Sequence, residues 1–210
     1  MRRKADYSLC LVTDRGLMSA PSIEIAVEGA IKGGCTLVQL REKSASSLDF
    51  YETALRVKKI TDSYGTPLII NDRLDIALAA GAGGVHVGQS DIPASVARRL
   101  APEMILGVSA SNLAEARAAA EAGADYLGVG AMFATGTKTD ANLTPMDEFR
   151  RIREEISIPI VVIGGVNAGN ARIFREAGAD GLAVVSAIIG APDAEAAARE
   201  IKAAFSGRGL

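Results

Sequence analysis

Two aspartates, Asp72 and Asp91, end similar segments of the sequence. The apolar run 68–70 leads into Asp72 after one asparagine, and the run 84–88 leads into Asp91 after a glutamine and a serine. Residues 74–80 between them have a helical composition, so the unit is predicted to be strand, helix, strand, with parallel strands. Both carboxylates would then emerge at one edge of a sheet, where a hard divalent cation relieves their repulsion. We therefore predict that Asp72 and Asp91 bind Mg2+.

Helix capping is the alternative role for both aspartates. Aspartate is a common N-cap residue, and a helix is expected to follow each position, the second one beginning near Pro93. The sequence leaves both interpretations open.

Cations gather in the segment 39–43, which reads Gln-Leu-Arg-Glu-Lys and follows another apolar run. Strand periodicity places Gln39, Arg41 and Lys43 on one face, and Leu40 and Glu42 on the other. One face therefore offers an amide and two cations, which suits an anionic ligand. A solvated strand end with an Arg–Glu pair is the alternative.

Two further segments are candidates for binding phosphate. The loop 133–142 is long and rich in Gly, Thr and Lys, as lids and anion cradles often are, but Thr137 stands before Lys138 where a Walker A motif needs glycine. Gly164-Gly165 and Val185-Ser186 follow the last two apolar runs, where backbone amides commonly bind phosphate. Glycines needed only for tight turns are the alternative.

The remaining reactive side chains have simpler interpretations. His86 is the only histidine and lies in a predicted strand without a Ser-His or Cys-His arrangement, so we interpret it as a hydrogen-bonded core residue. Cys10 and Cys35 lie in apolar runs and are expected to be buried free thiols.

Eight short apolar runs are predicted to be strands, at 7–13, 36–40, 68–70, 84–87, 105–108, 126–129, 160–163 and 181–185. Helical patterns occupy 23–32, 48–64 behind the capping pair Ser46 and Asp49, 74–80, 113–122, 146–156, 168–177 and 194–205. Eight such units predict a closed (β/α)8 barrel, the TIM-barrel architecture of the α/β class, in a single domain spanning 1–210. Glycines before every second strand favour tight helix-to-strand turns.

Composition narrows the class of protein. Hydrophobic residues make up 49% of the chain and aromatic residues only 4%, as in parallel sheets covered on both faces. The net charge of -2 gives no basic footprint for nucleic acid, and the longest apolar run, 181–191, is too short to span a bilayer. We expect a cytoplasmic protein, and the sequence permits a homo-oligomer without requiring one.

Taken together, these motifs resemble the thiamine-phosphate synthase family. The resemblance is carried by Val12-Thr13-Asp14, Asn71-Asp72-Arg73 and the segments 39–43, 84–91, 135–138, 163–166 and 185–188. It implies a transferase that joins a pyrimidine diphosphate to a thiazole phosphate and releases diphosphate and thiamine phosphate. The family's usual Phe-Pro-Thr is here Phe133-Ala134-Thr135, whereas every side chain expected to touch a ligand is kept.

The resemblance also implies roles for individual residues. Pyrimidine diphosphate would be bound by Gln39, Leu40, Arg41, Glu42, Lys43, Asn71, Ser109 and Lys138. The catalytic residues would be Arg41, Lys43, Ser109 and Lys138. The metal Mg2+ would lie on Asp72 and Asp91, and thiazole phosphate would be bound by Thr135, Gly136, Thr137, Gly165, Val185 and Ser186.

The residue types agree with this chemistry, because breaking a carbon–oxygen bond to diphosphate needs cations and no strong base. Three alternatives stay open: a thiazole tautomerase with the same barrel, a phosphosugar isomerase or epimerase, and a phosphate-ligand sensor without activity. The two aspartates with Lys43 and Lys138 argue against the tautomerase. An isomerase would need an acid–base pair near the substrate carbon, which Asp14 alone does not make.

Overall fold

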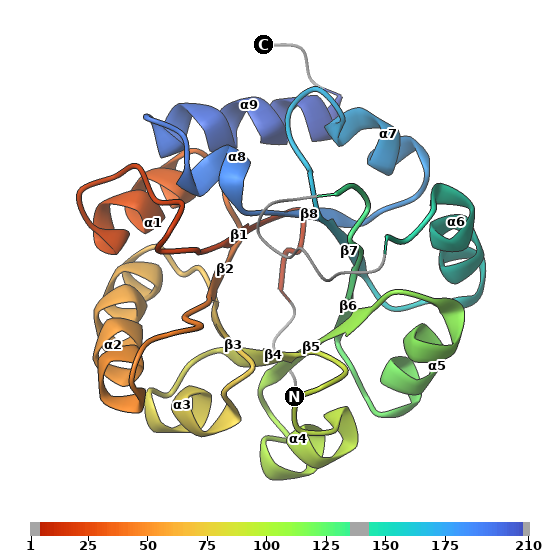
Figure 1. Cartoon of the computed structure of the whole chain (residues 1–210), viewed down its shortest axis with the longest axis horizontal. Coiled ribbons are helices and arrows are strands. Elements are labelled where there is room, and N and C mark those ends of the chain that lie inside the picture. The colour runs from red at the N-terminus through yellow and green to blue at the C-terminus, as the bar shows by residue number, and fades with distance from the viewer. Residues whose placement is uncertain (1–4, 135–142, 208–210) are drawn as a thin grey trace.

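Eight parallel strands close into a barrel at the centre of the molecule (Figure 1). The computed structural model describes residues 5–134 and 143–207. Each strand pairs with its neighbours in sequence, and the last pairs with the first, in the order β1 (Leu9–Val12), β2 (Leu37–Leu40), β3 (Leu68–Asn71), β4 (Gly84–Val87), β5 (Ile105–Ala110), β6 (Tyr126–Val129), β7 (Ile160–Ile163) and β8 (Gly181–Val184). The predicted (β/α)8 barrel is confirmed.

Helices surround the strands on the outside of the barrel (Figure 1). They are α1 (Ile23–Lys32), α2 (Ser47–Ser63), α3 (Leu74–Ala79), α4 (Ala94–Leu100), α5 (Leu113–Glu121), α6 (Met146–Glu155), α7 (Ala171–Glu176), α8 (Ser186–Ile189) and α9 (Ala194–Ser206). The short helix α8 is an extra turn between β8 and α9. Among the residues that the structure describes, no helix is both long and apolar enough to cross a membrane.

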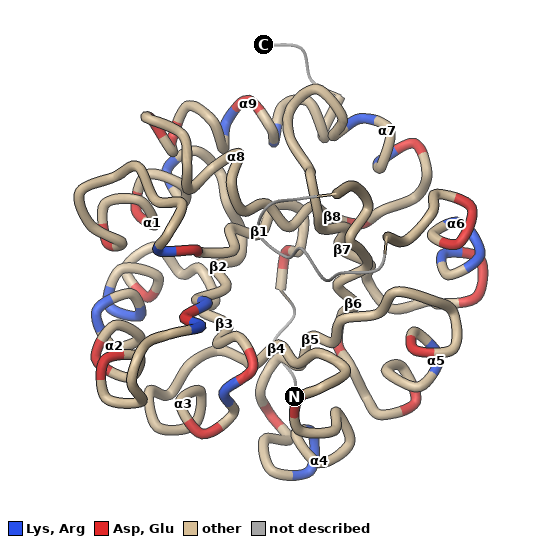
Figure 2. The backbone as a smooth tube through the Cα atoms, in the orientation of Figure 1, with Lys and Arg blue, Asp and Glu red and all other residues tan. Residues whose placement is uncertain are grey.

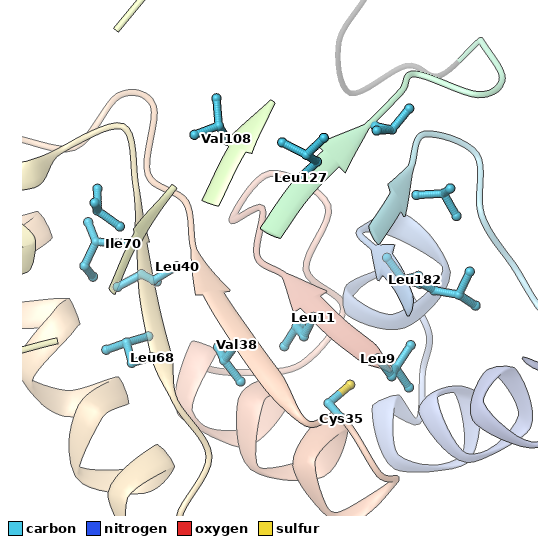
Figure 3. Close-up of a cluster of buried hydrophobic side chains, with 14 of the residues drawn as sticks. Leu9, Leu11, Cys35, Val38, Leu40, Leu68, Ile70, Val108, Leu127 and Leu182 are labelled. Carbon is cyan, nitrogen blue, oxygen red and sulfur yellow. The ribbon is translucent and has the colours of Figure 1, made fainter. Parts of the chain in front are cut away.

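Side chains alternate along each strand between two apolar layers. Leu9 and Leu11 of β1 point outward into the main core between the barrel and the helices, where Figure 3 shows Leu11 beside Val38 of β2. Cys10, between the two leucines, points into the barrel and belongs to a smaller inner cluster. The apolar side chains of this inner cluster do not fill one end of the barrel, where polar residues line a cavity. A site can therefore form at that end.

Local sequence signals explain most element boundaries. Ser46 caps α2 by accepting a hydrogen bond from the Asp49 backbone amide, as the capping pair predicts. The glycines before the even-numbered strands have positive φ angles of +108°, +61°, +86° and +93°, which permits the predicted tight turns (Gly34, Gly81, Gly123 and Gly178).

Most predicted boundaries differ from the observed ones by no more than two residues, and the largest difference is at the start of α7. The helix expected from residue 168 begins instead at Ala171. The cause is the side chain of Asn167, which accepts a hydrogen bond from the Gly169 amide and so holds this segment in a turn.

Candidate active site

A cavity of about 660 Å³ opens where the strands end, and most of the predicted site residues line it. Those with a described position in its wall are Gln39, Arg41, Lys43, Asn71, Asp72, Asp91, Ser109, Gly165, Val185 and Ser186. Thr135, Gly136, Thr137 and Lys138 lie outside the described residues. The cavity thus brings together predicted site residues from six strands, or from the segments that follow them, that are far apart in sequence.

The side chains of Leu40 and Glu42 do not belong to this wall. Leu40 is fully buried in the core between the barrel and the helices. Glu42 accepts a hydrogen bond from Arg15 at 2.7 Å, and its side chain is only 4% exposed. The strand alternation that places Gln39, Arg41 and Lys43 in the cavity sends these two outward, so they can reach a ligand only through their backbone atoms.

Asp72 and Asp91 face the cavity, and neither is used to cap a helix. The N-cap residues of α3 and α4 are Arg73 and Pro93, and neither cap position has a side-chain capping bond in the described structure. Asp72 has a φ of +64°, unusual for a residue other than glycine although aspartate tolerates it. The capping alternative therefore does not account for the two carboxylates.

The environment of Asp91 includes the charge of Asp72 and affects the ionisation of Asp91. Burial raises the pKa of Asp91, and repulsion from Asp72 raises it further. A hydrogen bond from the Gly88 amide, 2.7 Å from Asp91 Oδ2, and the charge of Lys43 act in the opposite direction. Negative charge is therefore concentrated at this point of the wall, and it favours a cation between the two aspartates.

The donor atoms of this pair fit Mg2+. They are carboxylate oxygens, and Mg2+ is commonly bound by one or two carboxylates together with water and substrate phosphates. Within residues 5–134 and 143–207, no group of three or more His, Cys, Asp or Glu side chains forms a denser metal cage. Lys43 Nζ lies 2.5 Å from Asp72 Oδ2 and supplies positive charge at the same place.

Arg41 is held by the segment that follows β1. Its Nη1 donates to Asp14 Oδ2 at 2.7 Å, and its backbone amide donates to Thr13 Oγ1 at 2.9 Å. Asp14 belongs to one of the sequence motifs, but its contact with Arg41 was not predicted. Its position just after β1 was the available signal, and it becomes informative only when β1 and β2 are known to be neighbours.

The opposite side of the mouth is built from backbone groups. Gly164 and Gly165 follow β7 with φ angles of +98° and +71°, and the side-chain amides of Asn167 and Asn170 both donate to the Gly165 carbonyl. The carbonyl is thereby fixed, and the loop keeps its shape around the cavity. Ser186 begins the short helix α8 beside it.

A buried polar cluster lies deeper in the barrel. His86 Nδ1 is 2.9 Å from Tyr126 Oη, and His86 Nε2 is 2.9 Å from Ser109 Oγ. The interpretation of His86 as a hydrogen-bonded core residue is confirmed, although it also lines the cavity. Tyr126 was not singled out in the sequence, because a tyrosine in an apolar strand looks like any other core aromatic residue.

Comparison with known proteins agrees with this geometry. Thiamine-phosphate synthase from Clostridium beijerinckii is 61% identical over 206 residues, covering 98% of this chain and 99% of the relative. The enzyme from Methanobrevibacter smithii is 49% identical and covers 97% of both chains. The solved structure of a thiamine phosphate pyrophosphorylase from Pyrococcus furiosus superposes with a TM-score of 0.90 at 38% identity over 97% of each chain. Together with a match of residues 9–188 to the thiamine monophosphate synthase model, these similarities establish that the chain belongs to the thiamine monophosphate synthase family.

Proposed function

We propose that this protein is a thiamine-phosphate synthase. It joins 4-amino-2-methyl-5-(diphosphooxymethyl)pyrimidine to 4-methyl-5-(2-phosphooxyethyl)thiazole, and the products are thiamine phosphate and diphosphate. The observation that carries this proposal is a single cavity with a charged wall on the β1–β4 side and a glycine-rich wall on the β7–β8 side. Such a cavity suits one anion that must leave and another that must only be held.

The reaction would begin with cleavage of the bond between the pyrimidine methylene and diphosphate. The bonding electrons leave with diphosphate, and the electron-rich aminopyrimidine carries the positive charge that remains on the methylene. The thiazole nitrogen then attacks this carbon and forms the new carbon–nitrogen bond. No general base is needed, and the rate acceleration would come from positioning of the substrates and from stabilisation of charge.

Arg41 and Lys43 would hold the diphosphate as its negative charge increases. Both line the cavity, and both already lie against carboxylates, Asp14 and Asp72. These pairs hold the cations in place before the substrate arrives, which reduces the reorganisation needed during the reaction. Lys138, from the loop outside the described residues, is proposed as a third cation.

Asp72 and Asp91 would hold Mg2+ beside these cations. When bound, Mg2+ supplies Lewis-acid stabilisation of the departing diphosphate. The proposal is supported by the oxygen donor set and by the absence of a capping role for either residue in the described helices.

The remaining contacts divide between the two substrates. Gln39, Asn71 and Ser109 would bind the pyrimidine diphosphate through side chains, and Leu40 and Glu42 through backbone atoms. Thiazole phosphate would be bound by the glycine-rich wall and by the loop that follows β6, through Thr135, Gly136, Thr137, Gly165, Val185 and Ser186. A phosphate that does not react needs only fixed amides, which this wall can provide.

The decisive experiment is to incubate the protein with both substrates and Mg2+ and to measure thiamine phosphate by mass spectrometry. Formation of thiamine phosphate and diphosphate in equal amounts is expected. A thiazole tautomerase would isomerise its thiazole substrate without consuming the pyrimidine diphosphate, and a sensor would bind both ligands without turnover.

We also propose that the enzyme works in the cytoplasm. Cys10 and Cys35 are buried free thiols, as a reducing compartment permits, and burial raises the pKa of Cys35 to about 12.

Size-exclusion chromatography with light scattering would determine whether the protein forms a homo-oligomer.

A further inference from the structure

Ser109 is the end of a chain of polar side chains that begins inside the barrel. Tyr126 and His86 are buried, and 2.9 Å contacts link Tyr126 Oη to His86 Nδ1 and His86 Nε2 to Ser109 Oγ. Ser109 is half-buried and faces the cavity. The chain therefore connects the barrel interior directly to the proposed pyrimidine diphosphate site.

The strands are built to make room for the His86–Tyr126 pair. His86 of β4 is in register with Gly107 of β5, and Gly107 is in register with Tyr126 of β6. A Cβ atom on Gly107 would lie 2.3 Å from Tyr126 Cζ and 2.4 Å from His86 Nδ1, and one on Gly128 would lie 2.9 Å from His86 Cε1. Barrel interiors are normally filled with branched side chains, and at Gly107 and Gly128 the space of such a side chain is occupied by His86 and Tyr126.

The burial of Tyr126 indicates the direction of the hydrogen bonds. Tyr126 is only 2% exposed, and burial raises its pKa, so the phenol keeps its proton and needs an acceptor for it inside the barrel. His86 Nδ1 lies 2.9 Å from Tyr126 Oη and can accept that proton. An imidazole that accepts at Nδ1 carries its proton on Nε2 and donates it to Ser109 Oγ.

We propose that Tyr126 and His86 are positioning residues that orient the hydroxyl group of Ser109. Because the Ser109 oxygen accepts from His86, its own proton must point elsewhere, and the cavity is the open direction. There it donates to an oxygen of the diphosphate, which gains negative charge as the carbon–oxygen bond breaks. The opposite direction of bonding would turn the lone pairs of Ser109 toward an anion. The target of Ser109 rests on the proposed function, whereas the direction of the hydrogen bonds does not.

Nuclear magnetic resonance of the 15N-labelled protein tests that direction without any turnover. The single histidine gives one pair of ring nitrogen signals, whose shifts and couplings identify the tautomer. We expect the proton on Nε2 at neutral pH, and we expect Tyr126→Phe to shift both signals. Tyr7→Phe is the matched control, because Tyr7 stacks on Tyr126 with ring centroids 4.9 Å apart and keeps its ring in the variant. A proton found on Nδ1 in the parent protein would overturn the proposal.

Kinetics test the consequence for catalysis. Ser109→Ala should lower kcat roughly 100-fold, as for a lost donor to developing charge. Tyr126→Phe should lower kcat roughly tenfold, the scale of supporting contacts, with little change in KM for the pyrimidine diphosphate. The double variant should be no slower than Ser109→Ala, since Tyr126 then has nothing to orient. If the double variant lost the product of the two single losses in kcat, Tyr126 would have an independent structural role, and the proposal would be wrong. If Tyr126→Phe does not fold, the tautomer of His86 in the parent protein still tests the proposal.

Discussion

The two sides of the cavity mouth are built from different types of residue. The segments that follow β1, β2 and β3 carry acidic and basic residues, whereas those that follow β7 and β8 carry none at the mouth (Figure 2). On the charged side, Arg41 and Lys43 are each paired with a carboxylate from a neighbouring strand end. On the neutral side, two asparagine side chains fix the Gly165 carbonyl. We conclude that one side is suited to stabilise a changing charge and the other to hold a constant one.

The largest expected effect comes from removing the carboxylates of the charged side. Asp72→Asn or Asp91→Asn should cost roughly 3 to 5 kcal/mol of transition-state stabilisation, since a metal ion acting as a Lewis acid contributes several kcal/mol. Steady-state kinetics over a range of Mg2+ concentrations would measure this loss. Neither variant should lower the melting temperature, because neither residue caps a described helix.

Asp75→Asn provides the matched control for these two variants. Asp75 is an exposed carboxylate at the start of α3 and pairs with Arg73 outside the cavity wall. Its variant should retain full activity and the same Mg2+ dependence. Full turnover by Asp72→Asn in the presence of a chelator would disprove the metal assignment.

Lys138→Ala should have the next largest effect. If Lys138 completes the charged side, its loss should raise the barrier to bond breaking by roughly 2 to 4 kcal/mol, the scale for one group that stabilises developing charge. Single-turnover measurements with both substrates at saturation would report this step directly. An unchanged single-turnover rate together with weaker thiazole phosphate affinity would contradict this role. Lys138 would then be a residue that binds thiazole phosphate and does not stabilise the departing charge.

The neutral side can be tested by crowding Gly165. Gly165→Val places a branched side chain at a φ of +71°, where a Cβ atom would lie 2.7 Å from Phe133 Cβ. Thiazole phosphate affinity should fall by about 2 kcal/mol, the scale of local backbone strain, while pyrimidine diphosphate affinity is kept. Calorimetry with each substrate separately would measure both. Equal losses of affinity for both substrates would mean that the whole mouth of the cavity had changed its structure.

Gly65→Ala controls for strain without crowding. Gly65 has nearly the same φ, +65°, but nothing lies within 4 Å of the position of its Cβ atom. This variant should lose some stability in thermal unfolding and no affinity for either substrate. If Gly165→Val and Gly65→Ala were unfolded to the same extent, general loss of stability would explain the result. Gly165→Val would then not test the phosphate site.

The smallest expected effect comes from the support of Arg41. Asp14→Asn keeps the shape of the side chain but removes the charge that holds the guanidinium at 2.7 Å. We expect pyrimidine diphosphate binding to weaken by about 1 kcal/mol, since Thr13 still holds the Arg41 backbone. Calorimetry would show it, and thiazole phosphate affinity should stay the same. A loss as large as that of Arg41→Ala would mean that Asp14 itself contacts a ligand.

The sequence by itself determined the elements and the faces of the strands. Apolar runs matched β4, β6 and β7 from end to end, because a strand buried on both faces has few polar residues to blur its limits. Alternation alone separated Gln39, Arg41 and Lys43 from their outward neighbours. The family motifs survive in the sequence because they are contiguous, so recognising them required no knowledge of the fold.

Only the tertiary structure decided which of these residues meet. Closure and register bring Asp14 to Arg41 and Lys43 to Asp72, 27 and 29 residues apart, and the absence of a side chain on Gly107 lets Tyr126 reach His86 across a strand. No local pattern encodes these contacts, since each depends on the stagger between neighbouring strands. The physical reason is that propensity and periodicity act over a few residues, whereas the site is assembled by the closed hydrogen-bonded ring of eight strands.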